Sequence, residues 1–242
     1  MRFAVIGGTG LIGSQVVDNL NAAGHEAVPH SQSTGTDVIS GLGLDEAVAG
    51  ADVLVNLTNS PTFDEASPAF FQTSMDNLLA AGQKGGIRHF VILSIVGVDQ
   101  VPELDYYRAK ALQEDILAAG PIPYSVLRAT QFMEFIDAIL SWTADGDTVR
   151  LPATPIQPIA AKDVAAAVAE VAAGAPLGGI RNIAGPEIFP LDELGRITLS
   201  HKSDSRTVVT DPTAGMFAAV KGDVLTDKNA HLAPTRYSDW LS

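Results

Sequence analysis

Two polar side chains near the middle of the sequence have the spacing that acid–base chemistry on a carbonyl group requires. Tyr106 and Lys110 stand four residues apart in a segment with helical spacing, so they share one face of a predicted helix. A tyrosine with its ordinary pKa of about 10 is a poor acid–base group at neutral pH, but a lysine cation beside it lowers that pKa. Ser94 ends an earlier predicted strand and can hydrogen-bond a substrate oxygen. We therefore predict Ser94, Tyr106 and Lys110 as catalytic residues that deliver a proton to oxygen while hydride reaches carbon.

The choice of tyrosine leaves alternatives open. Tyr107 is adjacent, but it lies only three residues before Lys110, so the four-residue spacing favours Tyr106. Alternatively, both tyrosines are ordinary residues of an amphipathic helix, and Lys110 only binds the ribose hydroxyls of a nicotinamide cofactor.

Glycines follow the first strand-like run, residues 3–6, in the pattern G-x-x-G-x-x-G. Gly7 permits a tight turn, Gly10 lets the backbone approach a pyrophosphate, and Gly13 lets the next helix pack on the strand. That helix, residues 11–23, offers free amides and the positive end of its dipole. The alternative is a glycine-rich turn without a ligand. We predict that this loop binds a dinucleotide through Gly7, Thr9, Gly10, Leu11, Ile12 and Gly13.

The segment after the second strand-like run bears on the choice between NAD and NADP. An acidic residue there would bind the ribose hydroxyls of NAD, but this sequence has none. His30, Ser31 and Ser33 can donate hydrogen bonds to a 2′-phosphate, which favours NADP and leaves NAD possible. The alternative is a polar loop that is indifferent to both. A further polar run after the third strand is suited to the ribose and nicotinamide side, through Leu57, Thr58 and Asn59.

Strand-like and helical segments alternate through the first part of the chain. Apolar runs with the length of buried strands lie at residues 3–6, 26–29, 52–57, 89–93 and 124–127. Helical spacing or helix stop signals mark residues 11–23, 43–49, 67–84, 104–119 and 131–142. The alternation predicts an α/β fold with a doubly wound parallel Rossmann sheet, in which ligands bind at the carboxyl ends of the strands.

The pattern changes in the rear part of the chain. Several prolines are followed by an alanine-rich helix at 162–173, a strand at 181–183, a helix at 192–200 and about forty residues without a regular pattern. We expect residues 1–150 to form the NAD(P)-binding Rossmann core. Residues 151–242 are expected to complete the sheet and to form a small C-terminal substrate lobe, within a single structural domain.

The glycine spacing and the Ser94, Tyr106, Lys110 order resemble the short-chain dehydrogenase/reductases, in particular the atypical NmrA-like branch. The likeness covers about residues 1 to 200 and includes residues 93–98, 107–110, 127–132, 157–160, 163–165 and 183–187. It implies a Rossmann fold, a nicotinamide cofactor, and contacts to the adenine amino group at Asp37 and Val38. It also implies a second possibility, because some members bind the cofactor as redox sensors without turning it over.

The composition excludes several classes of protein. A net charge of −13 repels nucleic acids and anionic membranes. The absence of cysteine rules out disulfides and thiolate chemistry, and the scattered histidines have no metal-ligand spacing, so no metal is expected. No signal segment and no apolar run of membrane-spanning length is present. We expect a cytoplasmic monomer or homodimer whose partner is a small-molecule substrate.

Together these features predict an NAD(P)-dependent oxidoreductase that moves hydride between a nicotinamide cofactor and a small apolar carbonyl, enone or quinone-like substrate. The pocket is expected at the carboxyl edge of the sheet, near Arg128 and lined by Ile95, Val96, Thr130, Gln131 and Phe132. The alternatives are a non-catalytic NADP(H)-sensing regulator and a nucleotide-sugar epimerase. The epimerase uses the same triad, but the chain is short for it and shows no cationic cluster for a second diphosphate.

Overall fold

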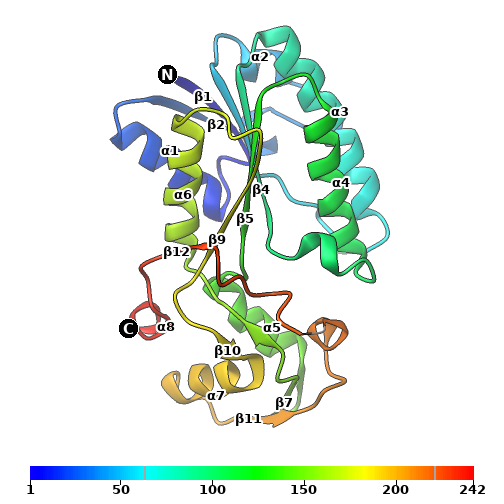
Figure 1. Cartoon of the computed structure of the whole chain (residues 1–242), viewed down its shortest axis with the longest axis vertical. Coiled ribbons are helices and arrows are strands. Elements are labelled where there is room, and N and C mark those ends of the chain that lie inside the picture. Colours follow the sequence, from blue (N-terminus) through cyan, green and yellow to red (C-terminus); the bar gives the residue numbers. More distant parts are fainter. Residues whose placement is uncertain (63, 221) are drawn as a thin grey trace. The chain divides into compact units, whose positions relative to one another are not determined.

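The computed structural model describes residues 1–62, 64–220 and 222–242 (Figure 1). The chain forms two compact units, each built from two segments. The first comprises Met1–Arg128 and Val164–Arg181, and the second comprises Ala129–Asp163 and Asn182–Ser242. Most of the alanine-rich helix thus belongs with the N-terminal half. The expected role of residues 151–242 as a substrate lobe stays a prediction.

A parallel sheet forms the centre of the first unit. Its strands are β1 (Arg2–Ile6), β2 (Glu26–His30), β3 (Val53–Asn56), β4 (His89–Ile95), β5 (Tyr124–Ala129) and β9 (Gly179–Ala184). The full order is β12-β9-β5-β4-β3-β1-β2, and β12 (His231–Leu232) pairs with the end of β9 inside the second unit. The chain moves outward from β1 to β2 and then returns to β3 on the other side of β1. This reversal confirms the predicted doubly wound sheet.

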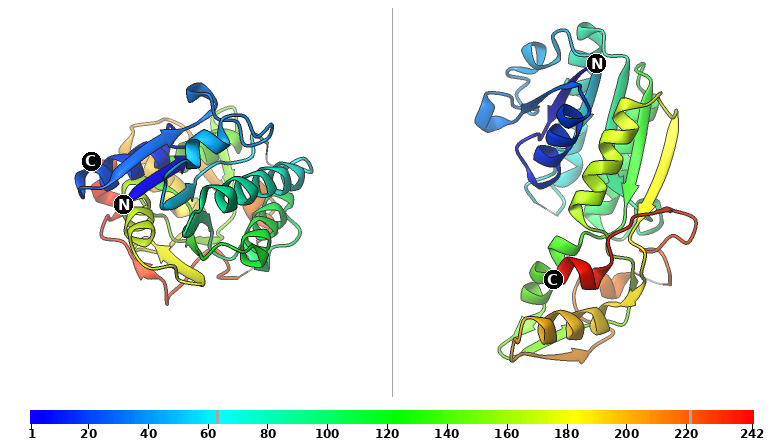
Figure 2. Two further views of the ribbon diagram at one scale, coloured as in Figure 1. Left: turned by 90° about the horizontal axis from the view of Figure 1, so that it is seen from above. Right: turned by 90° about the vertical axis from the view of Figure 1, so that its left-hand side faces the viewer.

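Helices cover both faces of this sheet (Figures 1 and 2). Helices α3 (Ser67–Gly85) and α4 (Asp105–Ala119) lie on one side, and α1 (Leu11–Ala22) and α6 (Ala161–Ala173) lie on the other. A short helix, α2 (Leu44–Val48), packs on α3. The core under α3 and α4 is apolar and includes Leu54, Met75, Leu78, Phe90, Ile92 and Leu117. Burial of these side chains fixes both helices on the sheet.

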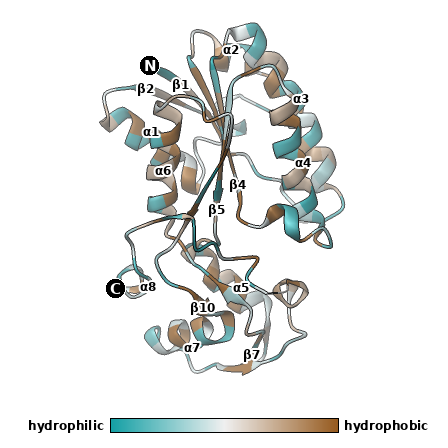
Figure 3. Ribbon diagram, in the orientation of Figure 1, coloured by the Kyte–Doolittle hydropathy of each residue, from teal (hydrophilic) through white to brown (hydrophobic). Residues whose placement is uncertain are grey.

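Each helix of the described residues is too short or too polar to cross a lipid bilayer. Figure 3 shows the reason, since hydrophilic and hydrophobic residues alternate along α3 and α7 (Leu191–His201). Such a pattern is typical of helices with one face on a core and one face in water.

The second unit contains smaller sheets. A three-stranded sheet has the order β11-β7-β6, and a two-stranded sheet pairs β10 with β8. Helix α7 packs closely on this three-stranded sheet. Gly195 lies at the contact, where a side chain would collide with Leu151 of β7. The elements are η3 (Met133–Phe135), α5 (Ile136–Trp142), β6 (Ala144–Asp145), β7 (Thr148–Leu151), β8 (Pro155–Ile156), β10 (Phe189–Pro190), β11 (Thr207–Thr210), η4 (Met216–Ala219) and α8 (Tyr237–Leu241).

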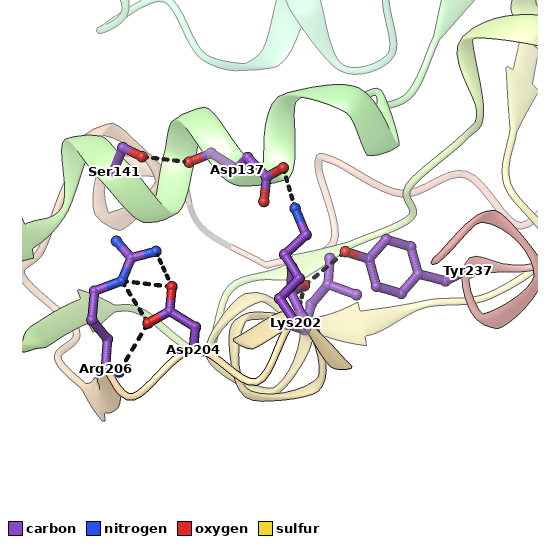
Figure 4. A network of polar contacts seen from close by, with 8 residues as sticks. Asp137, Ser141, Lys202, Asp204, Arg206 and Tyr237 are labelled. Atoms are coloured by element: carbon purple, nitrogen blue, oxygen red, sulfur yellow. Dashed lines mark hydrogen bonds and ion pairs between the residues drawn. The ribbon is translucent and has the colours of Figure 1, made fainter. Parts of the chain in front are cut away.

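Polar contacts join α5, α7 and α8 within this unit (Figure 4). Lys202 forms an ion pair with Asp137 of α5. The hydroxyl of Tyr237 lies 2.7 Å from that of Thr198, and the tyrosine ring stacks on Trp240 at 5.7 Å. Tyr237 is only 1% exposed, so the C-terminal helix is fixed by a buried aromatic side chain.

Several boundaries differ from the sequence expectations. The helix expected at residues 131–142 begins as η3 at Met133, because Gln131 accepts a backbone hydrogen bond from Ile159 and Met133 donates one to it. The final forty residues are not all irregular, since they contain β11, η4, β12 and α8. Strands β6, β8, β10 and β12 have two residues each, which is too short for periodicity to reveal.

The contacts of Tyr237 predict two different losses of stability. Tyr237→Phe keeps the ring and removes one hydroxyl, and Thr198 retains its hydrogen bond to the Leu194 carbonyl, so the loss is about 1 kcal/mol. Tyr237→Ala empties a buried site and costs about 3–5 kcal/mol. Chemical denaturation measures both, and equal midpoints for the two variants would refute the packing role.

Candidate functional site

The glycine loop joins β1 to α1 and has almost no room for side chains. Gly7 has a φ of +77°, and a Cβ there would lie 2.9 Å from the backbone carbonyl of Leu57. A Cβ at Gly13 would lie 2.1 Å from the carbonyl oxygen of Gly7. Gly8, which the spacing argument missed, is equally constrained, because its Cβ would lie 2.6 Å from the Val5 oxygen. The signal in the sequence that could have identified Gly8 is the pair of adjacent glycines, Gly7 and Gly8, directly after the strand.

The same loop fits the pyrophosphate of a dinucleotide. A Cβ at Gly10 would meet only the Gly7 oxygen, at 3.3 Å, so the outer side of this residue is open. Gly10 is also the N-cap of α1, and no side chain of the described residues caps that helix. The first amides of α1, from Leu11 to Gly13, therefore remain available to an anion. Thr9, Gly10 and Leu11 are exposed, whereas Ile12 is buried in the core.

The residues after β2 present hydroxyl groups next to this loop. The carbonyl oxygen of His30 accepts hydrogen bonds from the N–H groups of Gly7 and Gly8, at 2.8 and 3.2 Å. The hydroxyls of Ser31 and Ser33 lie 2.8 Å apart. Burial lowers the pKa of His30, which favours its neutral ring at neutral pH. The chain thus links the glycine loop directly to the serine pair.

Asp37 and Val38 have different surroundings. The N–H of Ile39 donates to the Asp37 carboxylate at 2.8 Å, and this hydrogen bond holds the pKa of that carboxyl below its usual value. Val38 is buried in the core, and its carbonyl accepts a hydrogen bond from Asn77 of α3. A role for Val38 in binding adenine would therefore rest on its backbone.

The loop after β3 connects the predicted cofactor residues to the predicted catalytic tyrosine. The buried Asn56 accepts hydrogen bonds from the N–H and the hydroxyl of Thr58, at 3.0 and 2.7 Å. The N–H of Leu57 donates to the Ile6 carbonyl of β1. Tyr106 donates its phenol proton to Oδ1 of Asn59 at 2.7 Å. The phenol of Tyr106 is therefore held against the residues that follow β3.

Tyr106 and Tyr107 begin helix α4 in different environments. Burial raises the pKa of Tyr106 to about 12, so the phenol is protonated at neutral pH. Its ring lies 6.4 Å from that of Phe71 and 6.5 Å from that of Tyr107. Tyr107 is only 4% exposed and packs as a core residue. The expectation that Lys110 lowers the pKa of Tyr106 is wrong for this structure, because burial dominates. The choice of Tyr106 as the acid–base residue stays a prediction.

Lys110 lies one turn further along α4 and is only 4% exposed. Its ammonium group donates to the backbone carbonyl of Leu93 at 2.7 Å and to the side-chain oxygen of Gln113. It also lies 5.0 Å from the centre of the Phe71 ring. Burial lowers the pKa of Lys110 to about 8, while the charge of Glu114 acts in the opposite direction. The lysine thus ties α4 to the carboxyl end of β4.

Ser94 stands next to that carbonyl, near the end of β4. It is 4% exposed, and its hydroxyl has no hydrogen-bond partner among the described residues. A buried hydroxyl without a partner is costly and is suited to a ligand oxygen. Ile95 is partly buried and Val96 is buried. Ser94, Tyr106 and Lys110 all belong to the first unit.

The remaining predicted pocket residues lie in the second unit. The hydroxyl of Thr130 and both polar atoms of the Gln131 amide are buried without partners among the described residues. Phe132 stacks on Phe135 with ring centres 5.7 Å apart. Their contact with a substrate stays a prediction, as does that of Ile95 and Val96.

Arg128 has a structural role that its position in the sequence did not suggest. Its guanidinium forms an ion pair with Glu114 at 2.6 Å and a second with Asp99 at 3.2 Å. Arg128 and Glu114 are both nearly buried. These two ion pairs neutralise the charge of Arg128, the residue that was expected at the edge of a pocket.

Gln113 and Glu114 are buried polar residues of α4 that the sequence reasoning did not single out. A polar residue inside a helical pattern indicates a solvent-facing position, so periodicity conceals such residues. The buried His89 hydrogen-bonds Ser125 at 2.8 Å. In the part of the chain that the structure describes, no group of three His, Cys, Asp or Glu residues could hold a metal ion.

Comparison with known proteins identifies the family of the chain. The sequence matches the NAD(P)H-binding family over residues 7–174. A (4-alkanoyl-5-oxo-2,5-dihydrofuran-3-yl)methyl phosphate reductase of Streptomyces griseus is 28% identical over 208 residues, which is 78% of this chain and 70% of the reductase. A photosystem II assembly factor of Synechocystis is 28% identical over 151 residues, which is 55% of this chain and 46% of that factor.

Solved structures share the fold. An NADPH-dependent quinone oxidoreductase of Escherichia coli, complexed with NADPH, superposes with a TM-score of 0.69 at 22% identity, over 87% of this chain and 78% of that one. A short-chain dehydrogenase/reductase superfamily protein of Agrobacterium tumefaciens with bound NAD has a TM-score of 0.73 at 16% identity, over 100% and 95% of the two chains. The chain therefore belongs to the NAD(P)H-binding family.

Proposed function

We propose that this protein is an NAD(P)-dependent oxidoreductase that acts on a small apolar carbonyl, enone or quinone-like substrate. The observation that carries the proposal is the hydrogen bond from Tyr106 to Asn59, because it sets a protonated phenol against the loop predicted to hold the nicotinamide. The similarity to a reductase adds support for the reaction class.

Each residue of the predicted triad has a distinct task. The nicotinamide supplies or accepts the hydride when it is bound. Tyr106 gives its proton to the substrate oxygen. Burial raises the pKa of its phenol to about 12, so proton transfer requires stabilisation of the phenolate by a cation. Ser94 uses its unpartnered hydroxyl to orient the same oxygen. The Lys110 cation stabilises negative charge on the phenol oxygen and can bind the ribose hydroxyls.

The preferred cofactor in this proposal is NADP. The hydroxyls of Ser31 and Ser33 lie together after β2, where a 2′-phosphate would be bound, and no acidic residue follows that strand. An NAD preference would instead require a carboxylate in this segment.

The second candidate is a cofactor-binding regulator without turnover. One observation favours it: the Lys110 ammonium is already engaged by Leu93 and Gln113. A screen of carbonyls and quinones with NADH and NADPH separates the two. Turnover of any substrate at about 1 s⁻¹ or faster would reject a purely sensory role.

Gly10→Ala tests the phosphate site without disturbing the fold. The added methyl group lies 3.3 Å from the Gly7 oxygen, a tight contact that a small backbone movement relieves, and it projects into the open side of the loop. The chain therefore folds, and NADPH affinity falls about tenfold. Fluorescence titration measures the affinity. Gly179→Ala, at a position where a Cβ meets nothing within 4 Å, is the control and leaves affinity unchanged. Normal affinity in Gly10→Ala would place the phosphates elsewhere.

Tyr106→Phe tests the acid–base role. The ring and its contacts with Phe71 and Tyr107 remain, but the proton donor is lost, so turnover falls about 10²–10⁴-fold while cofactor affinity is retained. Tyr107→Phe is the matched control at the adjacent position and keeps its turnover. Steady-state kinetics with the best substrate of the screen measure kcat for both variants. An unchanged kcat in Tyr106→Phe would contradict the assignment.

Ser33→Asp tests the choice of cofactor. A carboxylate beside Ser31 repels a 2′-phosphate and can bind ribose hydroxyls, so the Kd of NADPH rises about tenfold or more while that of NADH does not rise. Parallel titrations with both cofactors measure the ratio. Equal effects on the two would show that these serines do not face the phosphate.

A further inference from the structure

Burial of the Lys110 ammonium group is costly, and the contacts that compensate for it are few. The side chain is 4% exposed, and a buried cation needs acceptors to replace the water that it loses. Two oxygen acceptors touch it, the backbone carbonyl of Leu93 and the side-chain oxygen of Gln113, and the Phe71 ring lies 5.0 Å away. Of these two acceptors, Gln113 is the one that a side-chain substitution can remove.

The amide of Gln113 is oriented by a second contact. Gln113 is fully buried on α4, and its nitrogen donates to the sulfur of Met75 on α3 at 3.8 Å. The nitrogen of Asn56 reaches the same sulfur at 3.6 Å. Since a thioether is only an acceptor, it draws the amide nitrogen and leaves the amide oxygen facing Lys110. An apolar residue at this buried position would pack without the free-energy cost of burying a polar amide.

The charged groups around Lys110 do not take over this role. Glu114 lies on the same helix, but its carboxylate is bound by Arg128 of β5, which also pairs with Asp99. Tyr106 and Tyr107 precede Lys110 on α4 by four and three residues, and burial raises the pKa of Tyr106 to about 12. Helix α3 contributes Phe71 and Met75, which carry no charge, and β4 contributes the Leu93 carbonyl. The neutral Gln113 thus orients the cation without pairing its charge.

We propose that Gln113 is a positioning residue whose amide oxygen fixes the Lys110 ammonium beside the Leu93 carbonyl, at the end of β4 that carries Ser94. A neutral acceptor leaves the positive charge available to the nicotinamide ribose and to the phenol of Tyr106. A carboxylate at this position would neutralise the charge, and an apolar residue would leave the ammonium without direction. The inference rests on the proposed function, because it assigns Gln113 a task in the same site.

The first test is a pH titration of the cofactor-free protein with ¹³Cε-labelled lysine, followed by NMR, with Lys110→Arg used to assign the signal. Gln113→Leu removes an acceptor of the charged form, so the pKa of Lys110 falls by about one. Gln113→Glu, which keeps the shape of the side chain, raises it by at least about one. Gln83→Leu, the same change at an exposed position of α3, leaves it unchanged. An identical Lys110 pKa in all four proteins would overturn the inference.

The second test is NADPH affinity by fluorescence titration of the same proteins. Loss of orientation at Lys110 raises the Kd about tenfold in Gln113→Leu, and Gln83→Leu binds as the wild type does. Unchanged affinity together with a shifted pKa would also overturn the inference, since Gln113 would then tune the charge without positioning it. If Gln113→Leu does not fold, Gln113→Asn, whose shorter side chain withdraws the amide oxygen from the ammonium, decides through the Lys110 pKa and the NADPH Kd together. If the wild type binds neither NADPH nor NADH, the proposed function fails, and a Lys110 pKa that Gln113→Leu leaves unchanged would separately overturn the inference.

Discussion

Burial of one cation, the Lys110 ammonium group, constrains the geometry of the whole candidate site. The Leu93 carbonyl and the Gln113 amide hold it, so helix α4 is tied to the carboxyl end of β4. Gln113 in turn contacts Met75, which contacts Asn56 at the end of β3. The chain of contacts then runs through the loop after β3 and returns to α4 through Thr58, Asn59 and Tyr106. These contacts hold the predicted acid–base residue, Tyr106, beside the strand ends where the fold places ligands.

The glycine loop is a second constraint, and it is independent of the first. Gly7, Gly8 and Gly13 have no room for a Cβ because β1, the loop after β3 and α1 meet there at backbone distance. That close packing leaves the first amides of α1 uncovered, which gives a strongly acidic protein a local site for an anion. Gly10 differs from these three glycines, because its outer side is open and a side chain there would project toward the predicted pyrophosphate. The predicted phosphate site thus depends on the exclusion of side chains rather than on charged ones.

The elements of the first unit followed from sequence because each has a local signal. Strand and helix alternation predicted the sheet, and the spacing of Tyr106 and Lys110 predicted a shared helix face, which α4 provides. The partners of those residues had no local signal. Gln113 and Asn56 lie in the core through contacts between distant segments, and Arg128 pairs with Glu114 across a helix and a strand. The two-residue strands of the second unit depend on pairing partners that no short pattern encodes.

In the proposed function, catalysis depends on the cofactor and the phenol of Tyr106 meeting at the ends of β3 and β4. A crystal structure of the protein with NADPH measures this directly. We predict the pyrophosphate on the amides from Leu11 to Gly13, the 2′-phosphate at Ser31 and Ser33, and the nicotinamide ribose within hydrogen-bond distance of Tyr106 or Lys110. A pyrophosphate bound away from the glycine loop, or a nicotinamide directed away from α4, would contradict it.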